Sequence, residues 1–503
     1  MAIKKYFDQF PAKKAGMAVS FALFLCASLP AATSYAVPAA EASVQTSSFK
    51  LNSVGTDNIS FSVTNNSNSI GYFKLLPASA TAPSPEDMKR TASSVLMTAN
   101  QAITQSQTKL YPSTGYVLYF VAADSQGVLQ SNVQSLPLQT TRNELQWPFH
   151  SNSIWNMPIG SAAQYADANL PGTPGLTDNE LYWSQSSGID KEIIILTPQE
   201  TAVQVIQNTA GWSGNNRCYN STVTTGKLLA TVPMPVNYVI PHGNGNNGAV
   251  FLMQDGRTLL AMQPTTRCGT SEPATALLTF KTEDLYGMGT TGAHGGSRLS
   301  TLGGTLRLGE LRPNTPPPRH ALKLDVDTRV VFPKCSRTNT NLPACYRWPA
   351  ETADSGADGG GNYSYGKLAQ SNVSTAMSMG ALLALPPDVD INNMQLETAV
   401  AKQLAWTLQN YGTYIVDSSG GSNYFWGVET GPAGNFADQF KSDWGFDFAQ
   451  YNKGGSTAWV RDMQRIIVKL KVVVNNSASS IGGGGTPRQP LAVPLQPPGT
   501  QLR

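Results

Sequence analysis

The chain has 503 residues, a formal net charge of +3 and only 13% charged side chains. This balance provides no basic stripe, so we expect no nucleic-acid partner. The length exceeds what one ordinary hydrophobic core covers, and at least two domains are expected.

Residues 1–36 have the pattern of a secretory signal peptide. Lys4 and Lys5 precede the apolar run AGMAVSFALFLCASLP, and small residues lead to a cleavage site between Ala36 and Val37. No later run approaches the roughly 18 apolar residues that a membrane span needs. The sequence therefore predicts a protein that is secreted or periplasmic after signal removal, with no membrane span.

Four cysteines lie outside the signal: Cys218, Cys268, Cys335 and Cys345. An even number in an exported chain indicates two disulfides, for which three pairings exist. We favour Cys335–Cys345, which closes a short loop, together with Cys218–Cys268. No C-x-x-C pair occurs and the histidines lack ligand spacing, so we expect neither a metal nor a cofactor.

Residues 46–140 predict a β-sandwich. ISFSVT (59–64) alternates apolar and polar residues, and the segment 110–127 places Tyr116, Leu118 and Phe120 on one face. This segment resembles the sixth strand of fibronectin type III domains, and 71–93 resembles a middle stretch of bacterial versions. The resemblance implies a sandwich that spaces or attaches rather than catalyses.

The second predicted domain spans 145–476 and follows a linker over 141–152. Apolar segments of β type recur at 192–198, 230–240, 248–263, 274–280, 305–311 and 320–332. Asp255-Gly256 between two such runs predicts a hairpin.

Helical periodicity comes late, at 396–412 and 457–468, and a strand-like run follows at 470–474. The domain is therefore predicted to be mainly β, jelly-roll or sandwich-like, with one or two late helices. The Gly- and Pro-rich tail 477–503 is predicted to be disordered.

All four histidines, His150, His242, His294 and His320, lie in this second domain. We interpret His150 as a surface residue. The other three adjoin Gly- or Pro-rich turns at strand ends, where sites are commonly built.

The segment GAHGGSRLSTLGGTLRLGEL (292–311) contains six glycines. It lacks the lysine of a phosphate-binding P-loop and does not match G-x-G-x-x-G. We interpret 292–304 as a glycine-rich loop carrying His294 and Arg298. A strand over 305–311 then carries Arg307 and Glu310.

Two carboxylates are the candidate catalytic pair. In a strand, Glu310 would share a face with Leu306 and Leu308, and desolvation there would raise its pKa, as a general acid requires. Asp417 follows the apolar run YIV and precedes the aromatic segment that holds Tyr424 and Trp426. Each residue also has a non-catalytic interpretation. Glu310 would then face solvent at a strand end, and Asp417 would cap a turn through its own backbone.

Asp325 and Asp327 alternate with apolar residues in LDVDT. We interpret them as part of a solvated strand face.

Aromatic side chains lie among Asn, Gly and Ser, as in sugar-binding sites, although core packing explains any one of them equally well. They are Trp155, Tyr182, Trp183, Trp212, Tyr346, Trp348, Tyr363, Tyr365 and Trp426. Our candidate substrate-binding set is Arg298, Arg307, His242, Trp155, Trp348, Tyr424 and Trp426.

Several segments resemble, in order, the landmarks of a large and poorly characterised group of secreted bacterial proteins. They are HSNSIWNMPIG (150–160), GGTLRLGEL (303–311), RHALKLDV (319–326), CYRWPA (345–350), MGALLALPP (379–387) and LQNYGTYIVDSSG (408–420). The resemblance implies that His320, Trp348 and Asp417 occupy landmark positions, and it implies no mechanism.

These patterns favour a secreted, monomeric enzyme that degrades a polysaccharide. A glycoside hydrolase would use Glu310 and Asp417, with His294 and His320 nearby. A lyase would use a histidine base and an arginine, Arg298 or Arg307, to neutralise a uronic-acid carboxylate. The alternative is a non-catalytic glycan- or cell-wall-binding protein. A peptidase or esterase is weaker still, because no G-x-S-x-G occurs.

Overall fold

The computed structural model describes residues 44–492 and 495, apart from 56–57, 79, 109, 111–114, 141–144, 146, 172–184, 214–215, 243–245, 370, 421–422 and 451–456. The predicted signal peptide, Tyr182 and Trp183 lie outside the described residues.

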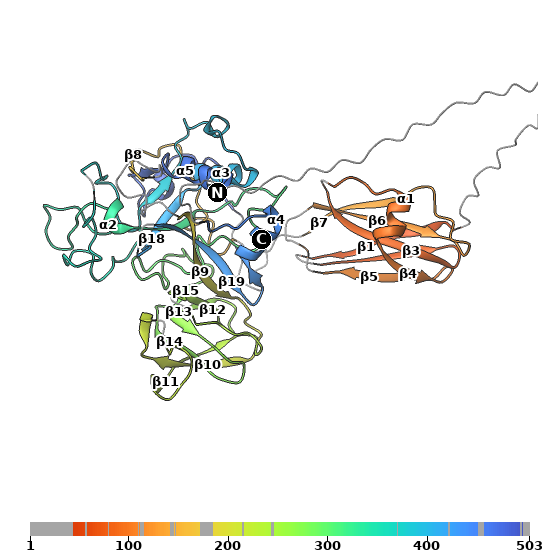
Figure 1. Cartoon of the computed structure of the whole chain (residues 1–503), viewed down its shortest axis with the longest axis horizontal. Coiled ribbons are helices and arrows are strands. Elements are labelled where there is room, and N and C mark those ends of the chain that lie inside the picture. The colour runs from red at the N-terminus through yellow and green to blue at the C-terminus, as the bar shows by residue number, and fades with distance from the viewer. Residues whose placement is uncertain are drawn as a thin grey trace, which may run out of the picture.

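The N-terminal domain is the predicted β-sandwich (Figure 1). One sheet has the order β1 (Thr46–Val54), β2 (Ile59–Asn65), β5 (Ile103–Gln107), and the other the order β4 (Ser93–Met97), β3 (Ser69–Pro77), β6 (Gly115–Ala123), β7 (Gln134–Gln139). Phe61, Leu118 and Phe120 are fully buried between the sheets. Helix α1 (Pro85–Thr91) covers the outer face of β6, so Tyr119 and Val121 are buried as well.

The second domain is built on one hydrogen-bonded network of 14 strands, so the mainly β prediction is confirmed. The main path runs β11 (Thr224–Pro233), β10 (Ala202–Asn208), β14 (Ala274–Thr279), β13 (Thr258–Thr266), β12 (Ala249–Leu252), β9 (Gln185–Ile195), β19 (Asn423–Gly431), β16 (Leu322–Val326), β18 (Thr413–Ser418), β17 (Leu382–Ala384), β21 (Lys471–Val473) and β8 (Tyr165–Asp167), with β15 (Glu283–Asp284) and β20 (Gly434–Asn435) pairing off it. Strands β10–β14 form the lower lobe in Figure 1.

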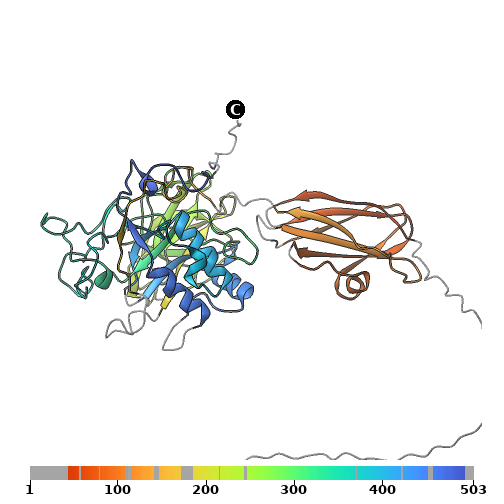
Figure 2. The ribbon, with the colours of Figure 1, turned by 90° about the horizontal axis from the view of Figure 1, so that it is seen from above.

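Helices follow late in the chain, as predicted, and gather on one side of this domain (Figure 2). They are α3 (Ala399–Asn410), α4 (Phe436–Trp444) and α5 (Ala458–Ile467), in addition to the short α2 (Thr328–Val331) and the 3-10 turns η3 (Gly211–Ser213), η4 (Ile391–Met394) and η5 (Ile481–Gly483). The side chains of Thr398 and Thr457 cap the first turns of α3 and α5. Their buried apolar residues belong to the same core cluster as residues of β16 and β18.

The expected strand at 305–311 is wrong. This segment forms turns and a single bridge between Leu306 and Val428, and Gly309 and Leu311 have positive φ. Gly303 is required just before it, because a Cβ there would lie 2.1 Å from Trp155 Nε1. The glycines therefore let this segment pass close to a buried indole.

The prediction of disorder from Ser477 is wrong for the described part of that segment. Gly160 bridges Pro487, and Arg488 donates to the Gln409 carbonyl and the Tyr165 hydroxyl. A Cβ on Gly485 would lie 2.6 Å from Ser161 Oγ. Low side-chain volume here permits close backbone packing, whereas we had interpreted it as flexibility.

Both predicted disulfides, Cys218–Cys268 and Cys335–Cys345, are confirmed. No helix within the described ranges is long and apolar enough to cross a membrane.

The two disulfides close loops of different length, with sequence separations of 50 and 10 residues. Loop-closure entropy predicts that replacing Cys218 and Cys268 by alanine costs about 1.4 kcal/mol more than replacing Cys335 and Cys345. Urea unfolding of the two double variants at pH 7 measures the difference. Equal losses, or a larger loss for the short loop, would contradict this account.

Candidate functional site

The side chain of a buried lysine reaches past one strand in the middle of the large sheet to a glutamate on the strand beyond it. Lys323 on β16 has no exposed side-chain surface, and its Nζ lies 2.8 Å from Glu192 Oε1 on β9. Strand β19 lies between them, and a Cβ on its Gly427 would lie 2.4 Å from Lys323 Cε. Because Gly427 has no side chain, the Lys323 side chain has space to pass it and reach Glu192.

The glycine-rich loop 292–304 covers this ion pair. The Ser300 and Thr301 carbonyls accept hydrogen bonds from Lys323 Nζ at 3.2 and 2.7 Å. His294 Nε2 lies 2.7 Å from Glu192 Oε1, and its Nδ1 lies 3.9 Å from Asp417 Oδ2. Burial lowers the pKa of His294, but the charge of Glu192 and the bonds to Asp417 and Glu192 outweigh it and raise the pKa to about 10.

Asp417 lies at the carboxyl end of β18, where several groups donate hydrogen bonds to its side-chain oxygens. The amides of Ser418 and Gly296 donate to Oδ1 at 2.8 and 3.2 Å, and Asn246 Nδ2 donates to Oδ2 at 3.5 Å. Together with His294 Nδ1, these contacts fix the orientation of the Asp417 carboxylate.

A second carboxylate, Asp354, faces Asp417 across Gly296. A Cβ on Gly296 would lie 2.9 Å from Asp417 Oδ1 and 3.2 Å from Asp354 Oδ2. These two distances bound the separation of the two oxygens at about 6 Å. A side chain at position 296 would push the carboxylates apart, so glycine permits their close approach.

The environments of the two acids differ. Burial in the first place, and then the charge of Asp417, raise the pKa of Asp354 to about 6. The hydroxyl of Tyr365 donates to Asp354 Oδ2 at 2.7 Å and fixes its orientation. Asp354 therefore keeps its proton to a higher pH than an ordinary aspartate, as a general acid requires, and it lies beside a second carboxyl group that accepts hydrogen bonds from two backbone amides.

Both acids line a pocket of about 540 Å³. Its wall on the lower lobe is formed by Trp212, Leu278 and Phe280, and its other side by Arg337 and residues 352–355. The Cys218–Cys268 disulfide ties the loop after β10, which carries Trp212, to the end of β13. Trp212 is 48% exposed, so its ring is available to a ligand.

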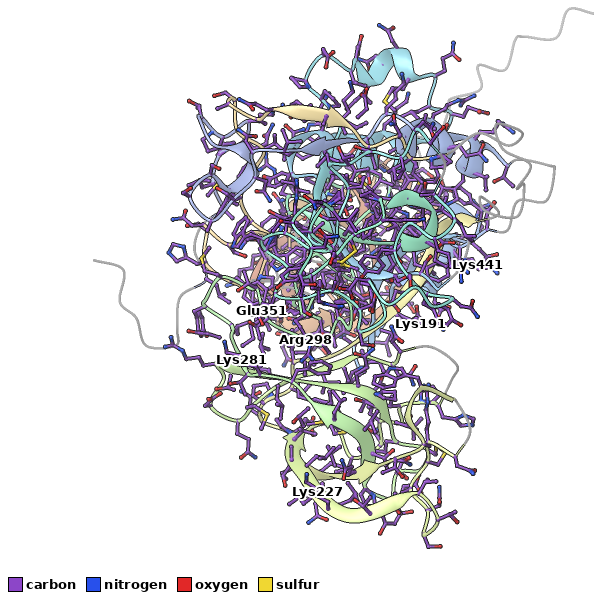
Figure 3. The ribbon with its side chains drawn as sticks, turned by 90° about the vertical axis from the view of Figure 1, so that its left-hand side faces the viewer. Lys191, Lys227, Lys281, Arg298, Glu351 and Lys441 are labelled. Carbon is purple, nitrogen blue, oxygen red and sulfur yellow. A yellow bond between two sulfur atoms is a disulfide. The ribbon has the colours of Figure 1, made fainter. Side chains whose placement is uncertain are left out.

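Arg298, which we proposed from the sequence as a substrate-binding residue, lines the same pocket. Its φ of 65° is held by bonds from its own amide to the His294 carbonyl and from the Gly292 amide to its carbonyl. Its guanidinium lies 5.2 Å from the centre of the Phe280 ring. Figure 3 shows Arg298 at the level where the lower lobe meets the rest of the domain.

Glu310 and His320 do not join Asp417, so the proposed Glu310–Asp417 pair is wrong. His320 precedes β16 at the end where β16 and the parallel β18 begin, whereas Asp417 lies near the end of β18. His320 lies five residues before Asp325, the residue of β16 that pairs with Asp417, and this corresponds to about 16 Å of extended chain. Neither Glu310 nor His320 lines the pocket.

Glu310 and His320 instead form a buried ion pair. His320 Nε2 lies 3.0 Å from Glu310 Oε1, and its Nδ1 lies 2.9 Å from the Ala321 carbonyl, so each ring nitrogen faces an acceptor. Burial lowers the pKa of His320, but the charge of Glu310 and these bonds outweigh it and raise it. The pair joins the turn at 307–310 to β16 and acts structurally.

Most other predicted substrate-binding residues belong to the core. Trp155 and Trp426 are 1% and 0% exposed, and the buried Tyr424 donates to the Pro171 carbonyl. Trp348 packs against the core cluster around Trp155.

Two charged members of that set also lie away from the pocket. Arg307 is buried and ion-paired with Glu429 at 2.8 Å. His242 is exposed and is not among the residues that line the pocket.

Sequence reasoning missed Asp190, Glu192, Lys323 and Asp354, and it placed Asp325 on a solvated face. A signal existed for four of them. Charged residues at every second position in IDKEIII and LKLDV mark one face of each strand. Asp325 is 4% exposed, so that face is buried. Asp354 lies in a turn-rich segment without periodicity.

Two solved structures each match about a fifth of this chain. No family model matches the chain, and no curated protein matches it. Among solved structures, a computationally redesigned β-sandwich protein covers 20% of this chain and 95% of its own, at 17% identity and a TM-score of 0.15. The FN1–FN3 domains of chicken CNTN1 cover 19% of this chain and 32% of their own, at 18% identity and a TM-score of 0.15.

The structural role of His320 predicts a pH-dependent stability effect. His320→Gln leaves Glu310 buried without its cation and should cost about 3 kcal/mol at pH 6. Because the folded-state pKa of His320 is raised, the wild-type advantage is complete below pH 6.5 and is lost as the pH rises through that raised value.

Urea unfolding at pH 5.5, 7 and 8.5 measures this effect. The matched control is His242→Gln at an exposed site, which should stay within about 0.5 kcal/mol of wild type. A deficit for His320→Gln that is absent at pH 5.5 would disprove the ion-pair role.

Proposed function

We propose that this protein is a glycoside hydrolase in which Asp354 is the general acid and Asp417 is the base or nucleophile. The observation that carries the proposal is the pair itself: two carboxylates about 6 Å apart or less, facing one pocket, of which one is desolvated and the other is held by donors. Glycosidic bonds are cleaved by such a pair through an oxocarbenium-like transition state.

The separation also favours one stereochemical course. Retaining enzymes keep their carboxyl groups about 5–5.5 Å apart, whereas inverting enzymes leave about 6.5–9.5 Å for a water. The bound of about 6 Å applies to one oxygen of each acid and lies nearer the retaining range, so the reaction we propose is a retaining one with Asp417 as nucleophile.

The pocket lining supports a sugar ligand. The exposed face of Trp212 offers a stacking surface for the C–H face of a sugar ring, while Asn246 offers a polar side chain for hydroxyl groups. Arg298 adds a positive charge, which favours a glycan that carries acidic groups.

A lyase reaction is less well supported. Its base would be His294, but that ring is buried, ion-paired with Glu192 and protonated at neutral pH. Export, attachment through a fibronectin type III-like domain, and membership of the group of secreted bacterial proteins remain part of the proposal. The two disulfides agree with an oxidising compartment.

The direct test incubates the chain from Val37 onwards with a panel of neutral and acidic polysaccharides. Reducing ends and near-ultraviolet absorbance are followed together, and proton NMR of early products reports the anomeric configuration. New reducing ends without an unsaturated product are expected. An absorbing product would indicate a lyase, and binding without cleavage across the panel would indicate a glycan-binding protein.

On a substrate so identified, Asp354→Asn and Asp417→Asn should each lower kcat/KM at least about 100-fold. Glu310→Gln, which alters the buried pair outside the pocket, should retain activity wherever the variant stays folded. Trp212→Ala should raise KM. Asp284→Asn, at an exposed ion pair, is the matched control. Full activity in Asp354→Asn with native-like circular dichroism would refute the assignment.

The raised pKa of Asp354 predicts how activity depends on pH. Since Asp354 must hold a proton to protonate the leaving oxygen, and its pKa is about 6, kcat/KM should fall as the pH rises through about 6. Initial rates from pH 4 to 9 measure this limb. Activity that keeps rising above pH 7 is incompatible with Asp354 as the acid.

A further inference from the structure

A small cavity lies against the large pocket. It encloses about 10 Å³, close to the space that one water molecule or one small cation takes. Asn246 and Gln263 line both spaces, so they stand between them. The remaining lining includes Asp190, Glu192 and His294.

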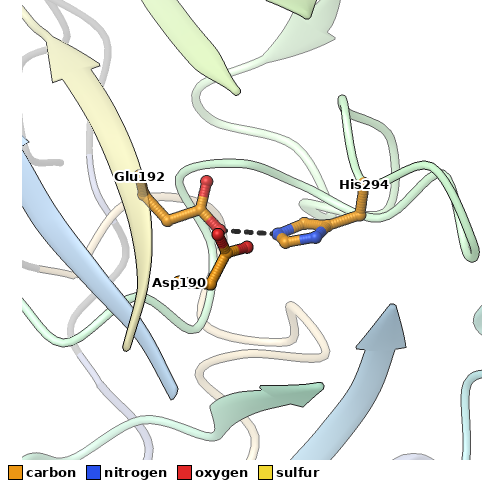
Figure 4. A group of neighbouring side chains, drawn as sticks. All are labelled: Asp190, Glu192 and His294. Atoms are coloured by element: carbon orange, nitrogen blue, oxygen red, sulfur yellow. Dashed lines mark ion pairs between the residues drawn. The ribbon is translucent and has the colours of Figure 1, made fainter. Parts of the chain in front are cut away.

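Asp190, Glu192 and His294 converge on this cavity (Figure 4). One potential ligand atom from each lies within 4.8 Å of those from the other two. Asp190 and Glu192 come from the same face of β9, and His294 comes from the loop that covers it. Two carboxylates and an imidazole are a common ligand set for zinc and also suit manganese.

Gln263 provides an independent indication of a ligand. The residue is 3% exposed, and its Oε1 is buried with no hydrogen-bond partner in the described part of the chain. A buried amide oxygen without a donor costs free energy unless something else binds it. A cation in the adjoining cavity would supply that partner.

Carboxyl groups outnumber basic side chains around the cavity. Asp190, Glu192, Asp325 and Asp417 lie near only two basic side chains, Lys323 and His294, and burial raises the pKa of Asp325. The Lys323 ammonium already has four partners, namely Glu192, the Ser300 and Thr301 carbonyls and, at 3.0 Å, His294 Nε2. No hydrogen bond to the side chain of Asp190 or Asp325 occurs within the ranges that the structure describes.

We propose that Asp190, Glu192 and His294, with the amide oxygen of Gln263, bind one divalent cation of the zinc or manganese type beside the pocket. The cation would displace the proton of His294, as metal binding to histidine generally does. Lys323 would remain bound to Glu192 as an outer partner. The site does not depend on the hydrolase assignment, since its ligands are distinct from Asp354 and Asp417.

The test uses the chain from Val37 onwards, purified without metal-affinity resin and then stripped with a chelator. Zn²⁺, Mn²⁺ and Ca²⁺ are titrated separately by calorimetry, with melting temperature as a second readout. One equivalent of Zn²⁺ or Mn²⁺ should bind and raise the melting temperature, with Ca²⁺ at least tenfold weaker. Co²⁺ should give a visible absorption band that is lost in His294→Gln.

Asp190→Asn, His294→Gln and Gln263→Met should each weaken Zn²⁺ binding at least tenfold. Asp438→Asn, an exposed carboxylate on α4, is the matched control and should bind as wild type does. The proposal fails if none of the three cations, each at 1 mM, produces binding heat or a thermal shift. A water molecule or protons would then occupy the cavity. It also fails if Asp190→Asn and Gln263→Met, both folded, bind as wild type does.

Discussion

The burial of one ammonium group organises the centre of the large domain. Lys323 has no exposed side-chain surface, and a buried charge is tolerated only where it is paired and hydrogen-bonded. Glu192 supplies the opposite charge from β9, and two carbonyls of the 292–304 loop supply the remaining acceptors. The contact between Lys323 and Glu192 depends on three features of the fold. They are the order of the strands, the absence of a side chain at Gly427 and the path of the 292–304 loop.

The loop held in this way determines the geometry of the pocket. Its carbonyls are fixed on Lys323, so His294 is held against Glu192 and Gly296 against the two acids. Glu283 adds a further restraint, since it accepts from Ser300 Oγ at 2.6 Å and from the Thr291 amide at 3.1 Å. The catalytic assignment and the cation site thus share one support while using different ligands.

Local patterns in the sequence predicted local features well. Asp255-Gly256 forms the predicted turn, with Asp255 accepting from the Arg257 and Thr258 amides, and the disulfide pairings follow from spacing. Asp417 was found because a charged residue ending a buried strand is visible in the sequence. These features depend on neighbours along the chain or on simple loop closure.

Features that depend on tertiary contacts were not predictable in this way. Period-2 alternation groups Lys323 with Asp325 but does not say whether that face is buried. Here the 292–304 loop covers the Lys323 ammonium. Glu310 was misplaced because an alternating stretch was taken as a strand, whereas glycine turns and Trp155 direct the chain differently. Asp354 becomes significant only because the fold brings it opposite Asp417.

The contact of residues 482–488 with residues 159–162 has a mechanical consequence. These segments lie at opposite ends of the second domain in sequence, yet they share backbone hydrogen bonds such as those between Gly160 and Gly482 and between Arg488 and Ile159. Gly160 and Pro487 pair in the antiparallel sense, so a force that separates the ends of this domain would open those bonds one after another before it reached the central sheet. The ends therefore act as a clasp, and resistance to pulling or to end-first proteolysis would rest on a few glycine-rich residues rather than on the buried charges.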